Sequence, residues 1–207
     1  MQYRRNIIIR AVMALASTLV ASAQQNPSQL DQLARRLADL ATRDAAVDEV
    51  VASSAAMTPV LLAWATKPPA DVPATDLNIG LAEAFDRMAT EAAIPFLIRV
   101  IAIKRFPFTF APWIKGASSI KLEYPAAEAL IRIGPTAGLA VIKAAQGPMT
   151  PVERLVAIFV VGQIDGVPAG PDFLLRARGD ADTQRVWAQD GIERQNRKEN
   201  GRKGDGK

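Results

Sequence analysis

Apolar residues recur at helical spacing through most of this chain of 207 residues. Four leucines near the start lie three or four positions apart: Leu30, Leu33, Leu37 and Leu40. This spacing places them on one face of a helix that Ser28 can cap. The pattern predicts an all-α fold in which short amphipathic helices each bury one face.

Prolines and glycines predict where these helices begin and end. Thr58-Pro59 has the form of a helix start, with threonine as the N-cap and proline in the first turn. Residues 67–75 hold three prolines and are expected to form a loop. A helical stretch over 76–105 is expected to break near Ile94-Pro95.

The second half of the chain is predicted to form a series of shorter helices. Their expected positions are a start at Pro125, a restart after Gly134-Pro135, a start at Thr150-Pro151, and two further helices over 171–178 and about 182–195. The segment 152–164 is apolar on nearly all sides, which predicts burial against several neighbours.

Two of the predicted helices contain nearly the same sequence. Ala82–Met88 and Ala127–Ile133 both begin with Ala-Glu-Ala and carry arginine near their ends. Arg154–Ala157 recurs in similar form as Arg185–Ala188, 31 residues later, and Ala127 lies 30 residues before Ala157. A period near thirty with two helices in each unit is typical of an α-solenoid, in which each helix pair packs against the next.

The repeated segments resemble the HEAT-repeat superfamily, in particular the short bacterial HEAT-like repeats of the phycobilin-lyase (PBS-lyase) type. The resemblance rests on residues 126–134, with the sequence AAEALIRIG, and on Thr150–Arg154 leading into Gly162. It implies an α-solenoid of antiparallel helix pairs. A non-repetitive helical bundle with coincidental Ala-Glu-Ala segments is the alternative.

The resemblance also implies a domain organisation and a class of function. It predicts a single repeat domain over 24–193, with its best repeats at 76–105 and 122–193. HEAT-like repeats serve as adaptors and chaperones and only occasionally as parts of enzymes, so the resemblance implies binding rather than lyase activity. The partner is expected to be another protein, and the oligomeric state is left open.

An aromatic insertion interrupts the repeats. The two Ala-Glu-Ala segments lie 45 residues apart, and the excess over one period coincides with 106–121. Insertions in solenoids emerge as loops on one face, which is often the binding face. The insertion holds the candidate partner-binding residues: Phe106, Phe108, Phe110, Trp113 and Lys115. They either form a recognition loop or fold back to plug the gap between repeats.

The first 23 residues have the form of a secretory signal peptide. Arg4 and Arg5 precede an uncharged apolar stretch, and Ala21 and Ala23 supply the small residues of a cleavage site. An uncleaved anchor is the alternative, but a spanning helix needs about 20 apolar residues and Arg10 leaves fewer. We therefore expect an exported protein, periplasmic or secreted, with no integral membrane segment in the mature chain.

The net charge of +4 belongs to the two ends of the chain. Residues 24–193 carry a net charge of −3, so the charge does not predict binding to nucleic acid. The segment 194–207 is rich in Lys and Arg and has no apolar residue beyond Asn196, which predicts a disordered basic tail.

The sequence contains no cysteine and no histidine. Their absence excludes disulfides, thiolate nucleophiles, Ser-His-Asp triads and zinc sites built on imidazole or sulfur. Ser118 and Lys121 match the S-x-x-K motif of serine β-lactamases, but the partner S-D-N and K-T-G motifs do not occur and 116–119 is expected to be a loop. Glu83 and Glu128 are expected on solvated faces, paired with Arg87 and Arg132 four residues on.

We therefore predict an exported, non-catalytic HEAT-like repeat protein that acts as a protein-binding or scaffolding module, with no cofactor or metal. The alternative is a cell-envelope hydrolase that uses carboxylates or the Ser118–Lys121 pair.

Overall fold

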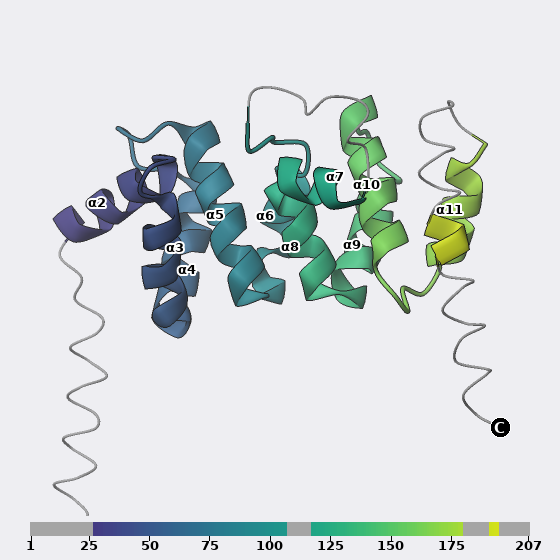
Figure 1. Cartoon of the computed structure of the whole chain (residues 1–207), viewed down its shortest axis with the longest axis horizontal. Helices are drawn as coiled ribbons and strands as arrows, with labels where there is room; N and C mark the ends of the chain where they lie inside the picture. Colours follow the sequence, from purple (N-terminus) through teal and green to yellow (C-terminus); the bar gives the residue numbers. More distant parts are fainter. Residues whose placement is uncertain (1–26, 107–116, 180–190, 195–207) are drawn as a thin grey trace, which may run out of the picture.

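Helices make up most of the chain that the structure describes. The computed structural model describes residues 27–106, 117–179 and 191–194 (Figure 1). Within these ranges the backbone is helical and contains no strand, which confirms the predicted all-α class. The expected signal peptide with Ala21 and Ala23, most of the insertion, and the tail beyond Arg194 lie outside the described residues.

Most elements follow one another with short connections, and the longer connection between Arg99 and Ala117 contains most of the predicted insertion. They are α2 (Pro27–Ala38), α3 (Arg43–Ala52), α4 (Ser54–Thr66), α5 (Ala74–Met88), the 3-10 helix η1 (Glu91–Ala93), α6 (Ile94–Arg99), α7 (Ala117–Glu123), α8 (Pro125–Ile133), α9 (Pro135–Ala144), α10 (Pro151–Gln163) and α11 (Gly170–Ala177). Residues 191–194 are also helical.

The helices succeed one another along the long axis of the molecule, broadly in chain order, from α2 to α11 (Figure 1). One series of contacts joins α3 to α5, α5 to α8 and α8 to α10. A second series joins α6 to α9 and α9 to α11, and these helices also pack against α8 and α10. Helix α2 lies against both α3 and α5. The chain therefore forms one continuous helical body.

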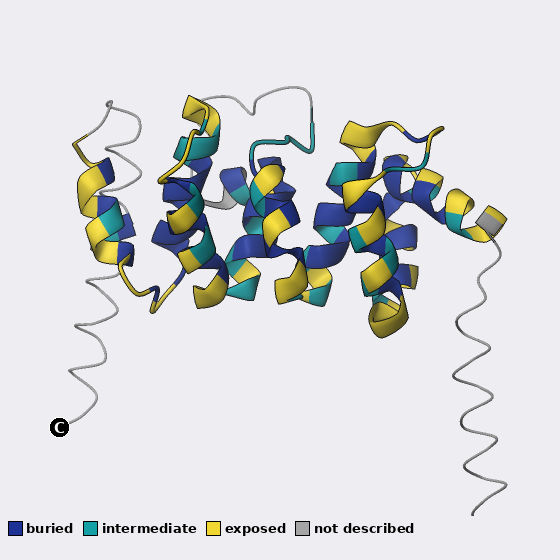
Figure 2. Cartoon of the chain, turned by 180° about the vertical axis from the view of Figure 1, so that it is seen from behind, coloured by how far each residue is buried: buried dark blue, intermediate teal, exposed yellow. Residues whose placement is uncertain are grey.

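The core runs between the helices along the whole of this body (Figure 2). Every residue from Val156 to Gln163 of α10 is buried, which confirms the burial predicted for this part of the segment 152–164. The first turn is different, since Val152 is 45% exposed. Leu33 and Leu37 are buried as their spacing predicts. Leu40 is 65% exposed, because α2 ends at Ala38 and the helical periodicity no longer applies. Its expected place on the buried face is therefore wrong.

Local steric signals predict most of the helix ends. The starts at Pro125, Pro135 and Pro151 are confirmed, and so is the loop between α4 and α5. At the start of α10 the Thr150 hydroxyl accepts a hydrogen bond from the Glu153 backbone N–H, and the Glu153 carboxylate accepts one from the Thr150 N–H. This capping box satisfies donors that a helix N-terminus leaves unpaired.

Three expected boundaries are wrong. Pro59 lies inside α4 rather than at its start, because the preceding turn forms and buries Met57 in the core. The break expected at Pro95 lies earlier, at Ala89, which adopts a left-handed conformation with φ of 47°. Proline in the first turn of α6 costs no hydrogen bond, so Pro95 starts that helix. Residues 117–119, expected as a loop, belong to α7.

Candidate functional site

The most hollowed surface beside the aromatic insertion lies where α2, α3 and α5 meet. Two cavities of about 340 and 470 Å³ there share four lining residues: Leu40, Arg43, Arg105 and Phe106. We call this surface the Leu40–Phe106 groove. Leu40 is exposed and Phe106 is half-buried, so both offer apolar area to solvent. Phe106 is also the first residue of the insertion, which places the groove at its base.

Arg43 forms the rigid part of the groove. Its side chain is only 4% exposed and reaches back to the end of α2. Its Nε donates to the Leu37 carbonyl at 2.9 Å, and its Nη2 donates to the Ala38 carbonyl at 3.0 Å. These carbonyls lack partners within their own helix, and the negative end of the helix dipole favours a cation there. Arg43 therefore fixes the turn that presents Leu40.

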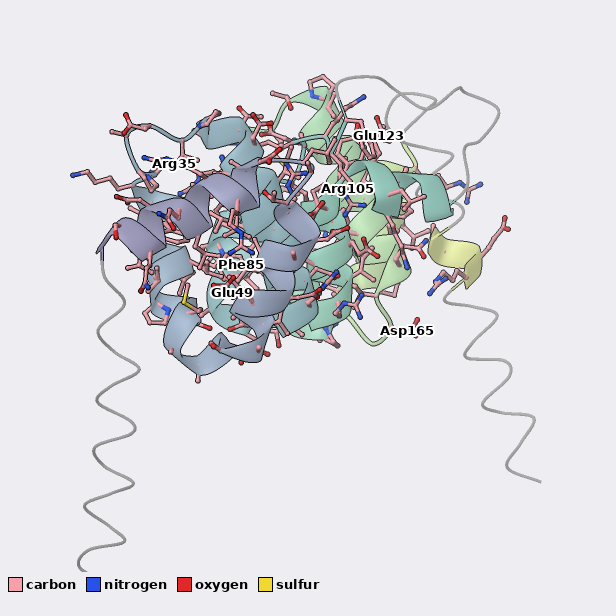
Figure 3. The ribbon with its side chains drawn as sticks, turned by 60° about the vertical axis from the view of Figure 1, so that its left-hand side comes forward. Arg35, Glu49, Phe85, Arg105, Glu123 and Asp165 are labelled. Carbon is pink, nitrogen blue, oxygen red and sulfur yellow. The ribbon has the colours of Figure 1, made fainter. Side chains whose placement is uncertain are left out.

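Arg105 joins the two equivalent glutamates of the Ala-Glu-Ala segments. Its Nε lies 2.7 Å from Glu83 Oε1, and its Nη2 lies 3.9 Å from Glu128 Oε2. The close contact is an ion pair rather than an aligned hydrogen bond. The Arg105 backbone N–H donates to the Glu123 carbonyl at 2.8 Å, and Figure 3 shows both residues at the same edge of the molecule. Arg105 thus ties the base of the insertion to α5, α7 and α8.

Glu83 is a partly buried carboxylate between two arginines. Its side chain is 14% exposed. Arg43 Nε lies 4.0 Å from its Oε2, whereas Arg105 contacts its Oε1. Burial raises the pKa of Glu83, and the attraction of Arg105 and Arg43 offsets only part of that effect. The expectation of a fully solvated glutamate at this position is therefore wrong.

A second ion pair lies on the other side of Arg105. Lys104 Nζ lies 2.6 Å from Oε1 of the buried Glu123, and it also lies 5.7 Å from the centre of the Tyr124 ring. The contact with Glu123 raises the pKa of Lys104, while burial raises the pKa of Tyr124. Both groups therefore keep their protons at neutral pH, and neither is prepared to act as a base.

The arginines of the repeated segments pair with other helices. Arg87 of α5 contacts Asp48 of α3, and Arg132 of α8 donates to both carboxylate oxygens of Asp86 of α5, at 2.8 and 3.2 Å. The contact with Asp86 raises the pKa of Arg132. The pairing expected within each helix, four residues back, is therefore wrong. The stacked helices bring the acidic group of the preceding helix closer.

The charged residues of the groove and the Ser118–Lys121 pair are the groups on which a reaction could be based. The groove lining combines arginines with acidic residues, and among them Glu83 contacts both Arg43 and Arg105. No group of carboxylates in the described ranges is arranged to hold a metal ion. Ser118 and Lys121 lie one turn apart on α7, as S-x-x-K requires, yet the chain lacks the other motifs of that mechanism.

The structure places one of the five predicted partner-binding residues. Phe106 lies in the groove, while Phe108, Phe110, Trp113 and Lys115 lie outside the described residues. Sequence reasoning missed Leu40, Arg43 and Arg105. The leucine periodicity ends at Leu40, and a polar turn follows directly. This pattern is the signal in the sequence that could have identified Leu40 as exposed.

No protein-family model matches the chain, and no curated protein or solved structure matches it either. Among the described helices, none combines the length and the apolar character that crossing a bilayer requires.

Proposed function

We propose that this protein is an exported α-solenoid of antiparallel helix pairs that acts as a non-catalytic protein-binding or scaffolding module. Two independent features support the proposal: a bridge that recurs between successive helices, and an open groove with exposed apolar residues at the base of the insertion. Export rests on the signal-like pattern of residues 1–23.

The recurrent bridge is the observation that carries the repeat architecture. Arg87 and Arg132 occupy the same position in the segments Ala82–Met88 and Ala127–Ile133, and each reaches an aspartate on the preceding helix of one contact series. Asp86 of α5 accepts hydrogen bonds from Arg132 of α8, while its neighbour Arg87 contacts Asp48 of α3. Helices of a non-repetitive bundle have no reason to share such a register, whereas stacked repeats reproduce it from unit to unit.

The groove supports the choice of partner surface. Exposed apolar side chains ringed by charged ones are typical of protein-binding sites, where the apolar centre contributes affinity and the charged rim selects the partner. Leu40 and Phe106 supply the apolar centre. Arg35, Asp39, Asp44 and Asp76 supply a rim of mixed sign. A protein surface with both apolar and charged residues complements this arrangement better than a uniformly charged polymer does.

In-cell photo-cross-linking tests the proposal. A photoreactive amino acid at position 40 should capture a defined protein in the cell envelope. The same group at position 175 is the control, because Leu175 is also exposed, at 53%, and borders neither cavity of the groove. Equal capture at both positions, or none at position 40, would contradict the proposed surface. The mass of the captured chain tests export, since cleavage after Ala23 leaves a protein that begins at Gln24.

Deletion of 107–116 separates the two interpretations of the insertion. If the segment is a recognition loop, the deletion removes cross-linking and leaves the free energy of unfolding nearly unchanged. If it is a plug, the deletion lowers the free energy of unfolding and leaves cross-linking at position 40 in place.

A further inference from the structure

A third cavity, of about 220 Å³, lies between α9, α10 and α11 and shares no lining residue with the Leu40–Phe106 groove. Its inner wall is apolar: Ile142 comes from α9, Ile158 from α10, and Phe173 and Ala177 from α11. All but Phe173 are buried. Such a wall favours an aliphatic group over water.

The mouth of this cavity is cationic. Arg154 and Arg176 line it together with Gln146, and no acidic residue among those that the structure describes does. Arg176 and Gln146 are exposed, which places them at the open end. A ligand that enters this cavity therefore meets positive charge first and apolar side chains beyond it.

Both guanidinium groups keep donors available. Arg154 Nη1 donates to the Ala145 carbonyl at 3.3 Å, and Arg176 Nε donates to the Asp172 carbonyl at 3.2 Å. These contacts hold the side chains in place and use one nitrogen of each group, whereas a guanidinium has five N–H donors. In the described part of the chain, neither arginine has a carboxylate partner. The nearby Glu153 accepts from the Thr150 backbone instead.

We infer that this cavity binds a monocarboxylate that carries a compact aliphatic group. The carboxylate contacts Arg154 and Arg176, because guanidinium and carboxylate form charge-assisted hydrogen bonds. The aliphatic group lies against Ile142 and Ile158. The cavity volume of about 220 Å³ lies below the range of about 300–1,000 Å³ that is typical of sites for drug-sized ligands. It therefore suits a branched short-chain acid or a C-terminal leucine rather than a long-chain lipid.

An NMR chemical-shift titration of the full chain with isocaproate tests the inference. Isocaproate should bind with a Kd of about 1 mM, as expected for so small a ligand. Isocaproamide, which has the same shape without the charge, should bind at least about tenfold more weakly. Acetate, which has the charge without the aliphatic group, should bind more weakly by a similar factor.

Two variants identify the residues that bind. Arg176→Gln removes one exposed guanidinium and should weaken isocaproate binding about tenfold. Arg178→Gln is the matched control, because Arg178 is also exposed and lies two residues further on, yet does not line the cavity. It should change the Kd less than twofold. Circular dichroism verifies that both variants keep their helices.

Several results would overturn the inference: no binding of isocaproate, equal binding of the acid and its amide, or equal weakening by both variants. A peptide that ends in a free leucine, compared with its C-terminal amide, distinguishes the two sources of the carboxylate. Tighter binding of the free-ended peptide than of isocaproate supports the site and assigns it to protein C-termini. Binding of isocaproate alone supports the site and assigns it to a small acid.

Discussion

Arginine side chains connect the elements of this protein in two ways. Four of them reach backbone carbonyls near the ends of other helices: Arg43 at α2, Arg99 at α4, Arg154 at α9 and Arg194 at α10. Others form carboxylate pairs between helices. A carbonyl at a helix C-terminus has no partner within the helix, so a cation there satisfies a hydrogen bond and the helix dipole together.

The bridge between Asp86 and Arg132 is expected to couple α5 and α8. A double-mutant cycle with Asp86→Ala and Arg132→Ala should give a coupling free energy of about 1 kcal/mol, since Asp86 is largely buried and the contact is bidentate. Arg36 and Glu49 provide the control, because their single contact is exposed on both sides and should couple by about 0.3 kcal/mol. Urea unfolding measures both, and equal coupling in the two cycles would contradict a special role for the bridge.

Glu83 is expected to make stability depend on pH in an unusual direction. Because its pKa is raised in the folded protein, the folded state holds this proton more tightly than the unfolded chain does. Its contribution to the free energy of unfolding therefore falls as the pH rises from about 4 through the raised pKa. Glu83→Gln removes that contribution. The wild type should thus lose stability relative to the variant as the pH rises. The opposite trend would show that the attraction of Arg43 and Arg105 outweighs the effect of burial on the pKa of Glu83.

At the scale of elements, small residues decide how closely the helices pack. Gly80 of α5 lies against the backbone of α2, where an added Cβ would lie 2.2 Å from the Leu37 carbonyl oxygen. Gly162 of α10 and Gly191 are in similarly close contact, since a Cβ on Gly162 would lie 3.0 Å from the Gly191 Cα. Backbone atoms cannot rotate away as side chains do. The glycines therefore set the separation of these segments.

Gly80→Ala tests this packing. Alanine favours the helix by about 1 kcal/mol, but the clash with the α2 backbone should outweigh that gain and lower the free energy of unfolding by about 2 kcal/mol net. Gly147→Ala is the matched control, because the nearest atom to its added Cβ is 3.4 Å away. It should change stability by less than about 0.5 kcal/mol. Equal effects of the two substitutions in urea unfolding would contradict close packing of α2 on α5.

Much of the element structure could be predicted because its signals are local. Proline and glycine restrict the backbone at their own positions, so the starts of α8, α9 and α10 follow from the sequence. Pro59 and Ala89 could not be predicted in the same way. The position of Pro59 within α4 depends on tertiary burial of Met57. Ala89 adopts a left-handed conformation, which the sequence does not indicate because glycine or asparagine usually occupies such a position.

The site was less predictable, because its contacts join distant parts of the chain. Glu128 and Arg132 are four residues apart and suggest a pair within one helix, yet Arg132 contacts Asp86, 46 residues away. Arg105 lies beside the predicted insertion, and no sequence pattern distinguishes it from other arginines. Only the stacking of α5 on α8 brings both Glu83 and Glu128 within reach of its guanidinium.

At the scale of the whole molecule, the helical body presents two different surfaces. The Leu40–Phe106 groove lies where α2, α3 and α5 meet, and the cavity with Arg154 and Arg176 lies among α9, α10 and α11. Figure 1 shows these two groups of helices toward opposite ends of the molecule. An elongated stack separates such surfaces by its own length, which agrees with the scaffold role proposed above. Substitution at one surface is therefore expected to leave binding at the other unchanged.

The affinity of the partner captured at position 40 tests the central claim most directly. Leu40→Arg places a charge in the apolar centre of the groove and should weaken binding at least about tenfold, without loss of helix content. Leu175→Arg introduces the same charge at an exposed leucine outside the groove and should change the Kd less than twofold. Equal weakening by the two substitutions, or an unchanged Kd for Leu40→Arg, would contradict the groove as the binding surface.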